Sequence, residues 1–179
     1  VMPVRAQLAV RTIFNFLGPL TNPAGAPRQL VGVSDPAYLE TMAGALALLG
    51  TEHALLVTGE DGVDELSISA PTTVVEVKDG QLERYTVTPE EVGLTRASAD
   101  DVPGGDPRQN ADTARQIYAG RPGAARDLAV LNAGAAIYAA GGADTLEQGV
   151  RAAEQAIDDG AASAALERFV ARTRELAPA

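Results

Sequence analysis

The first half of the chain alternates short apolar segments with a helical pattern. Residues 28–34 (RQLVGVS) and 53–59 (HALLVTG) are short, mostly apolar runs bounded by turn residues, which is typical of buried parallel strands. Between them, residues 35–50 begin with an Asp-Pro pair and end at a glycine, so they predict a capped helix. A strand–helix–strand order with short connections predicts a parallel sheet covered by helices.

The second half predicts a hairpin followed by helices. Residues 72–87 alternate apolar and polar positions around a Lys-Asp-Gly turn, the pattern of an antiparallel hairpin. From residue 106 onwards, glycines separate segments that predict helices at 106–120, 123–141, 145–160 and 161–177. We therefore expect an α/β protein with a mixed, largely parallel sheet, flanked by helices and carrying one antiparallel hairpin.

Residues 4–18 have the apolar spacing of a helix, and the stretch RTIFNFLGPLTNPAG (11–25) ends that pattern. Proline lacks a backbone N–H and disfavours helical conformation in the residue before it. The helix is therefore expected to stop at Gly18-Pro19, with a second stop at Asn22-Pro23. Residues 98–109 are expected to form a long surface loop.

Composition is that of one globular unit. With 179 residues, of which 46% are hydrophobic, the chain can bury a full core, and residues 1–179 are expected to form a single α/β domain portion. The absence of cysteine excludes disulfides, thiolate nucleophiles and cysteine metal sites. No apolar run has the length of a membrane span and the first residues do not resemble a secretory signal, so a cytoplasmic location is expected.

The net charge of the chain indicates which kinds of partner it can bind. The formal net charge is −10, and Lys78 is the only lysine. Because nucleic-acid surfaces depend on clustered Lys and Arg, this balance argues against a nucleic-acid partner. An anionic substrate would need a few arginines and a divalent cation gathered at one place.

The acidic segment TGEDGVDELS (58–67) is the clearest candidate for chemistry. It follows a predicted strand, and ligand sites in open α/β sheets lie at the carboxyl ends of strands. Asp64 and Glu65 are adjacent carboxylates on a turn, which suits Mg²⁺, a cation that prefers oxygen ligands shared with phosphates and water. The alternative, which composition by itself favours, is a solvated acidic loop. Glu60 and Asp61 are expected to be solvated neighbours.

Other polar residues give weaker signals. A guanidinium such as that of Arg5 can clamp a carboxylate or phosphate, although a lone arginine on a helix is more often solvated. His53, the only histidine, has no metal-ligand spacing around it, so a structural role is expected. The small residues at 132–142 are explained by close packing of a helix on the sheet.

Three motifs together resemble one family. They are VRAQLAVRTIFNFLGPLTNPA (4–24), DGVDELS (61–67) and LNAGAAIYAAG (131–141). In this order and at these separations they resemble the C-terminal part of the anthranilate phosphoribosyltransferases of tryptophan biosynthesis. The resemblance covers essentially the whole chain, and its first motif is long and specific.

The resemblance implies a reaction and a set of site residues. Family members transfer a phosphoribosyl group from PRPP to the amine of anthranilate, release pyrophosphate and require Mg²⁺. Arg5 is implied to contact the anthranilate carboxylate, and Pro19 to line the aromatic pocket. Asp64 and Glu65 are implied to hold Mg²⁺ near the diphosphate. The resemblance identifies no acid–base residue in this chain, and it implies a homodimer for the intact enzyme.

The same resemblance implies that parts of the family's site lie elsewhere. The family's helical N-terminal domain, its Gly-rich GTGGD loop, a nearby Ser/Thr-rich segment and its KHGN stretch have no counterpart in this sequence. The chain is therefore expected to be the C-terminal part of the catalytic domain, and to be inactive by itself.

Other interpretations stay open. One is an enzyme similar to the pyrimidine nucleoside phosphorylases, which have the same fold, although FNFLGPLTNPA and DEL fit the anthranilate enzymes better. Another is a non-catalytic relative that binds nucleic acid or a protein, against which the charge of −10 and the retained Arg5, Asp64 and Glu65 speak. The last is an inert truncated chain.

Overall fold

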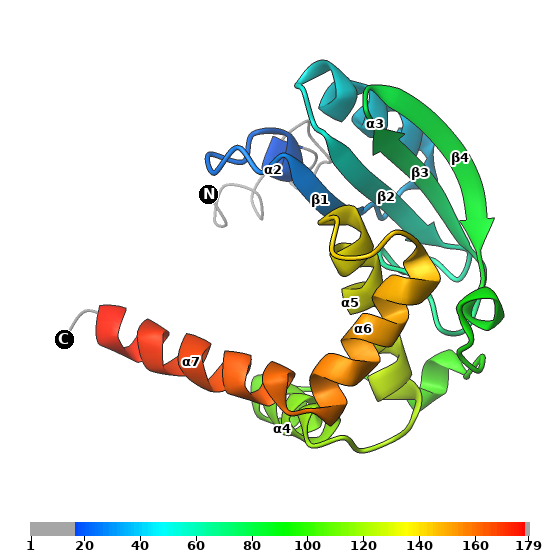
Figure 1. Ribbon diagram of the computed structural model, residues 1–179. Coiled ribbons are helices and arrows are strands. Elements are labelled where there is room, and N and C mark those ends of the chain that lie inside the picture. The colour runs from blue at the N-terminus through cyan, green and yellow to red at the C-terminus, as the bar shows by residue number, and fades with distance from the viewer. Residues whose placement is uncertain (1–16, 178–179) are drawn as a thin grey trace, which may run out of the picture.

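The structure, a computed structural model, describes residues 17–177 (Figure 1). Its helices are α2 (Leu17–Leu20), α3 (Leu39–Leu48), α4 (Pro107–Tyr118), α5 (Ala124–Ala139), α6 (Leu146–Asp158) and α7 (Ala161–Leu176). Its strands are β1 (Arg28–Gly32), β2 (His53–Gly59), β3 (Thr72–Lys78) and β4 (Gln81–Val87). Short 3-10 helices, η2 (Pro36–Tyr38), η3 (Pro89–Val92) and η4 (Ala99–Asp101), lie between them.

The strands form one mixed sheet in the order β1-β2-β3-β4. β1 and β2 are parallel and joined through α3, whereas β2–β3 and β3–β4 are antiparallel. The β3–β4 turn has positive φ at both Asp79 (49°) and Gly80 (76°), the geometry that suits a tight hairpin. The predicted mixed sheet, hairpin and flanking helices are therefore confirmed, and among the described strands the parallel pairing is the one between β1 and β2.

The sheet separates two hydrophobic cores. α3 covers one face, and α5 with α6 covers the other (Figure 1). Every residue of β2 is buried, and its side chains alternate between the cores: Ala54 and Leu56 pack with α3, whereas Leu55 and Val57 pack with α5. β2 is thus an interior strand that is covered on both faces.

Helix starts follow the caps expected from the sequence. Asp35 accepts a hydrogen bond from the backbone N–H of Ala37 at 3.1 Å, at the start of the segment that continues as α3. Asp106 and Gln109 form a reciprocal capping box at α4, with both hydrogen bonds at 2.8 Å. The predicted surface segment 98–109 therefore contains η4 and ends in the first turn of α4.

The Gly18-Pro19 stop predicted from the sequence is wrong. Both residues lie inside α2, whose turn is closed by the N–H of Thr21 donating to the carbonyl of Leu17 at 2.8 Å. Proline is accommodated in the single turn that is described, and residues 4–16 of the predicted helix lie outside the described residues. The helix ends after Leu20, and Asn22 then accepts from the N–H of Ala24 at 3.0 Å, so the second predicted stop is confirmed.

The small residues of the third motif bring α5 and α6 together. A Cβ added to Gly134 would collide with the backbone of Val150, and one added to Gly149 would collide with the backbone of Gly134. Only glycine permits this approach. The expectation that these residues serve packing is correct, but their partner at this point is helix α6 and not the sheet.

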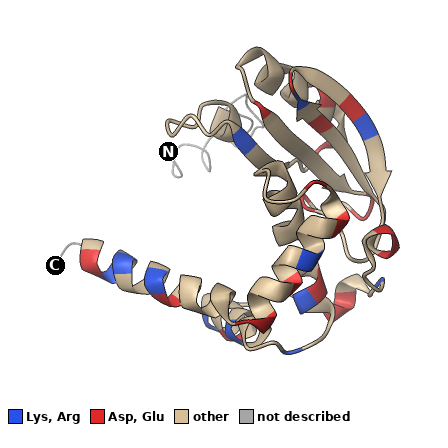
Figure 2. Ribbon diagram, in the orientation of Figure 1, with Lys and Arg blue, Asp and Glu red and all other residues tan. Residues whose placement is uncertain are grey.

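Charged side chains are interspersed on the helices. Acidic and basic residues follow one another along α6 and α7 (Figure 2). Several form ion pairs one turn apart, such as Arg151–Glu154 at 2.6 Å and Arg172–Glu175 at 2.9 Å. None of the helices within residues 17–177 combines the length and the hydropathy that a membrane span requires.

Candidate metal and substrate site

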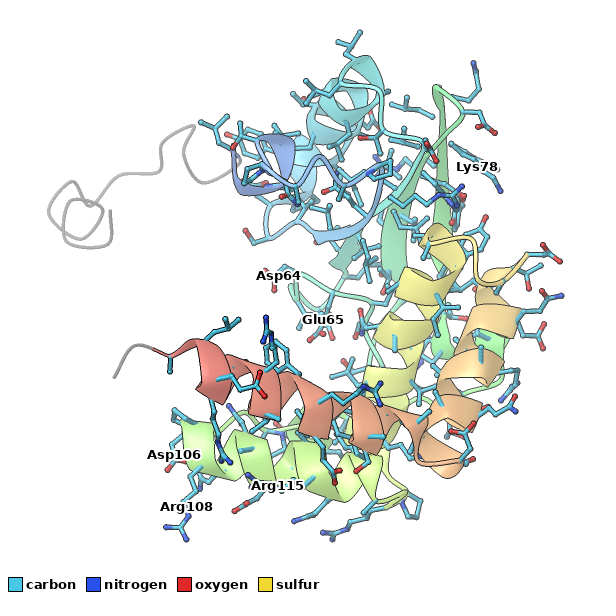
Figure 3. All side chains as sticks on the ribbon, turned by 60° about the vertical axis from the view of Figure 1, so that its left-hand side comes forward. Asp64, Glu65, Lys78, Asp106, Arg108 and Arg115 are labelled. Atoms are coloured by element: carbon cyan, nitrogen blue, oxygen red, sulfur yellow. The ribbon has the colours of Figure 1, made fainter. Side chains whose placement is uncertain are left out.

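The loop 60–71, which joins β2 to β3, carries the predicted acidic pair. Asp64 and Glu65 are exposed on it, and Figure 3 shows them close together. The backbone of Asp64 packs on the end of β1, because a Cβ added to Gly32 would collide with the carbonyl oxygen of Asp64. The predicted position of the pair, at the carboxyl end of a strand, is therefore confirmed.

Asp61 organises the same loop from within. Its carboxylate accepts hydrogen bonds from the hydroxyls of Ser67, at 2.6 Å, and Ser69. Partial burial raises the pKa of the Asp61 carboxyl, but the hydrogen bonds to it together lower this pKa by more. The net effect is a pKa below the usual value. The expectation that Asp61 is only a solvated neighbour is wrong, because its hydrogen bonds to Ser67 and Ser69 give it a structural role. The sequence did not indicate these partners, which lie six and eight positions further along the chain.

Asn132, in α5, holds the residue next to the pair. Its Oδ1 accepts from the backbone N–H of Leu66 at 2.9 Å, and its Nδ2 donates to the carbonyl of Leu66 at 2.9 Å. Nδ2 also donates to the carbonyl of Leu128 within α5, at 3.1 Å. Leu66 itself is fully buried. The backbone that follows Glu65 is thus fixed from α5.

Negative charge gathers on this loop, and no ion pair offsets the charge of Asp64 or Glu65 within residues 17–177. Within residues 17–177, neither the Asp64 nor the Glu65 side chain forms a hydrogen bond or ion pair. Glu65 is exposed as a residue, yet partial desolvation of its carboxyl, followed by the negative charges of Asp64 and Asp61, raises its pKa. A bound cation would relieve this repulsion.

The pair fits one kind of metal ion. No group of three or more metal-ligating side chains lies together within the described residues. Mg²⁺ usually keeps several waters and binds through one or two carboxylates plus substrate phosphates. Asp64 and Glu65 therefore fit a Mg²⁺ shared with a phosphorylated substrate, and do not form an all-protein cage.

Pro19 lies at the other end of the strands. It lines a hollow of about 230 Å³, together with Leu20, Gln29, Leu49 and Thr51. Gln29 and Thr51 mark the amino ends of β1 and β2, whereas Asp64 and Glu65 follow the carboxyl end of β2. The structure therefore does not bring Pro19 and the acidic pair together. Arg5 lies outside the described residues.

A buried polar cluster, which sequence reasoning missed, lies at the amino end of β2. Nε2 of His53 is 2.7 Å from Oε1 of Glu76, which also accepts from the hydroxyl of Tyr138 at 2.8 Å. Oε2 of Glu76 accepts from Tyr85 at 2.8 Å. Burial, and then the hydrogen bond and charge of Glu76, raise the pKa of both tyrosines, that of Tyr138 to about 12. His53 therefore has the structural role expected of it. The sequence signal that could have indicated this cluster is the single glutamate, Glu76, within the apolar strand β3.

Comparison with known proteins gives a consistent match. The glycosyl transferase family, a/b domain, matches residues 1–163. An anthranilate phosphoribosyltransferase from Rubrobacter xylanophilus is 55% identical over 178 residues, which are 99% of this chain and 52% of that protein. One from Paramagnetospirillum magneticum is 53% identical over 169 residues, 94% of this chain and 49% of that protein.

Solved structures agree. Anthranilate phosphoribosyltransferase from Thermus thermophilus is 46% identical, with a TM-score of 0.86, over 97% of this chain and 51% of that chain. The Saccharomyces cerevisiae enzyme in complex with PRPP and Mg is 26% identical, with a TM-score of 0.87, over 98% of this chain and 51% of that chain. The chain spans about half the length of the curated relatives it matches.

Proposed function

This chain belongs to the glycosyl transferase family, a/b domain, and on that premise we propose that it forms part of an anthranilate phosphoribosyltransferase. The proposed reaction transfers phosphoribosyl from PRPP to the amine of anthranilate, releases pyrophosphate and serves tryptophan biosynthesis. The observation that carries the proposal is the carboxylate pair, Asp64 and Glu65. It is held by its backbone and lacks protein partners within residues 17–177.

Asp64 and Glu65 are proposed to hold Mg²⁺ beside the diphosphate of PRPP. Bound there, the cation supplies positive charge to the leaving diphosphate. Two structures of the S. cerevisiae enzyme, one of them of a point variant, are described with Mg, and one of the two also with PRPP, which supports a small phosphorylated substrate and this cation. The pair's contribution is to present two negative charges at a fixed place, at the carboxyl end of β2.

Arg5 and Pro19 are proposed to bind anthranilate. The guanidinium of Arg5 would hold the carboxylate bidentately and so orient the amine, which needs alignment more than deprotonation. Pro19 would contribute rigid apolar surface. A relative from S. cerevisiae is described in complex with 4-fluoroanthranilate, which supports an aromatic carboxylate as ligand. Pro19 lies at the amino ends of the strands, where it lines the hollow of about 230 Å³ with Leu20 and Leu49.

Several further assignments stay proposals. We propose that residues 1–179 are one α/β domain portion, that the intact enzyme is a homodimer, and that it is cytoplasmic. We also propose that the 179-residue chain alone does not turn over substrate, because the resemblance implies a Gly-rich diphosphate loop that its sequence does not contain.

The metal assignment is tested in the full-length gene product that carries this sequence. Asp64→Asn/Glu65→Gln keeps side-chain shape and removes two charges. The Mg²⁺ concentration for half-maximal rate should rise at least about tenfold and kcat should fall, with little change in KM for anthranilate. Loss of anthranilate fluorescence measures the rate.

A matched control removes two adjacent charges elsewhere. Asp100→Asn/Asp101→Asn alters an exposed pair in the segment 98–109, and it should leave the Mg²⁺ dependence unchanged. If both double variants behave alike, Asp64 and Glu65 belong to a solvated acidic loop and the metal assignment fails.

The anthranilate assignment has its own test. Arg5→Ala should raise KM for anthranilate roughly ten- to a hundred-fold, because a charge-assisted bidentate contact is lost. KM for PRPP should stay nearly constant. Arg5→Lys should rescue poorly, since lysine lacks the planar fork. A variant that changes only the kinetics of PRPP would assign Arg5 to the phosphate side of the site.

A further inference from the structure

We propose that Asn132 is a positioning residue, which fixes the loop backbone that carries Asp64 and Glu65 and thereby sets the affinity of this pair for a divalent cation. The inference rests on the proposed function, because it takes the two carboxylates as cation ligands.

Among the described residues, the acidic pair is placed through its backbone. Within residues 17–177 the side chains of Asp64 and Glu65 have no hydrogen-bond partner or ion pair. On the Asp64 side, the loop backbone packs on Gly32 at the end of β1. On the other side, the residue after Glu65 is Leu66, and Asn132 contacts both of its backbone polar groups.

The side-chain amide of Asn132 is itself held in one orientation. Its amide accepts from the N–H and donates to the carbonyl of Leu66, both at 2.9 Å, as a neighbouring strand would. A third hydrogen bond, to the carbonyl of Leu128 at 3.1 Å, ties the amide to its own helix. Both hydrogens of the amide are thus used, so its orientation is determined. α5 in turn is locked to α6 where Gly134 meets Gly149.

The hydrogen bonds of Asn132 hold the loop backbone in place against the repulsion between its carboxylates. Asp61, Asp64 and Glu65 are three carboxylates on one short loop, so their negative charges repel one another. Without the two hydrogen bonds of Asn132, the backbone at Leu66 can yield to this repulsion and the carboxylates can separate. Groups that orient metal ligands typically contribute ten- to a hundred-fold in affinity.

The chain contains a matched control. Asn110, in α4, contacts Gly105 in the same way: it accepts from the N–H and donates to the carbonyl, both at 2.9 Å. Asp64 and Glu65 lie well apart from Asp106, the neighbour of Gly105, in Figure 3. Asn110→Ala therefore removes the same two kinds of hydrogen bond without touching loop 60–71.

The experiment measures binding of Mn²⁺ alone, from the EPR signal of the free ion, to the folded protein and its variants. Asn132→Ala should weaken Mn²⁺ binding about tenfold, and Asn132→Ser, which keeps a hydroxyl, should fall between it and the unmodified protein. Asn110→Ala should bind as the unmodified protein does. Asp64→Asn/Glu65→Gln should abolish the binding. Circular dichroism establishes that each variant is folded at the temperature used.

Hydrogen exchange gives a second readout that needs no metal. The amide of Leu66 should exchange faster in Asn132→Ala, while that of Leu56, in the centre of β2, should keep its protection. Unchanged Mn²⁺ affinity in Asn132→Ala, with binding still lost in Asp64→Asn/Glu65→Gln, would overturn this inference and leave the metal site standing. Binding that survives Asp64→Asn/Glu65→Gln would overturn the metal assignment and this inference together.

Discussion

Two regions of this protein use α5 to hold carboxylates, and they do so in opposite ways. At the amino end of β2, Tyr138 of α5 donates directly to the carboxylate of Glu76, which His53 and Tyr85 also contact. At the carboxyl end, Asn132 of α5 contacts only backbone. It leaves the carboxylates of Asp64 and Glu65 without partners among the described residues.

This difference distinguishes a carboxylate that stabilises the fold from carboxylates that could bind a cation. The oxygens of Glu76 are occupied by protein groups and shielded from water, so no ligand can use them. Asp64 and Glu65 keep their oxygens free within the described part of the chain, while Asn132 and Gly32 restrain the backbone that carries them. Preorganised but unsatisfied acceptors are what a cation site requires. Each region therefore responds differently to substitution.

Glu76→Ala should have the largest effect on stability. It leaves His53, Tyr85 and Tyr138 without their common partner in a buried place, and the free energy of unfolding should fall by about 3–5 kcal/mol. Urea denaturation followed by circular dichroism measures it. Glu83 pairs with Glu76 across β3 and β4 but is exposed, so Glu83→Ala should change stability by less than about 0.5 kcal/mol. Equal effects at the two positions would contradict a structural role specific to Glu76.

Gly32→Ala should disturb the loop through its backbone. The new Cβ collides with the carbonyl of Asp64, so the fold should lose about 2 kcal/mol and Mn²⁺ affinity should drop. Gly44 lies inside α3 with no atom near the position of a Cβ, and Gly44→Ala should stabilise the protein by about 0.5–1 kcal/mol. Thermal unfolding together with Mn²⁺ titration measures both. A Gly32→Ala variant with unaltered Mn²⁺ binding would show that the packing on β1 does not place the pair.

Tyr138→Phe should change how stability depends on pH. The pKa of Tyr138 is raised to about 12 in the folded state, against about 10 in an unfolded chain. Since the folded state binds this proton more tightly, its contribution is complete below pH 10 and is lost as the pH rises towards 12. The phenylalanine variant should lose about 1 kcal/mol at neutral pH and show a shallower alkaline decline. Urea denaturation in a series of buffers tests this, and an identical decline in both proteins would contradict it.

Asp64→Asn/Glu65→Gln should have the smallest effect on stability. Removing two exposed, mutually repelling charges should alter the free energy of unfolding by less than about 0.5 kcal/mol without metal. The same change should abolish Mn²⁺ binding. A loss as large as that of Glu76→Ala would mean that the pair supports the fold, which its lack of partners within residues 17–177 argues against.

Local patterns were sufficient to predict most of the fold. β1, α3 and β2 follow their apolar segments, and the hairpin follows from Asp79-Gly80, which accept the positive φ that the turn requires. The error at Gly18-Pro19 came from treating proline as an obligatory helix stop, whereas Pro19 lies within the described turn of α2. The place of Asp64 and Glu65 was also predictable, because a strand's end can be recognised in the sequence.

The contacts that give each carboxylate its role could not be predicted in this way. Leu66 and Asn132 are 66 positions apart, and Glu76 and Tyr138 are 62 apart. The periodicity of a helix or strand indicates contacts only between residues close in the sequence, so it cannot predict contacts at such separations. Even the partners of Asp61, only six and eight positions away, depend on how the loop folds back on itself.

The sequence by itself determined the elements, their order and the position of the acidic pair, because these depend on hydrophobic periodicity and turn chemistry within short segments. The tertiary structure decided which carboxylates are satisfied and which are free, since that depends on donors carried by α5 and β4 to opposite ends of β2. Hydrogen bonding and burial are properties of neighbours in space. The difference between a structural glutamate and a candidate ligand therefore appears only after the chain is packed.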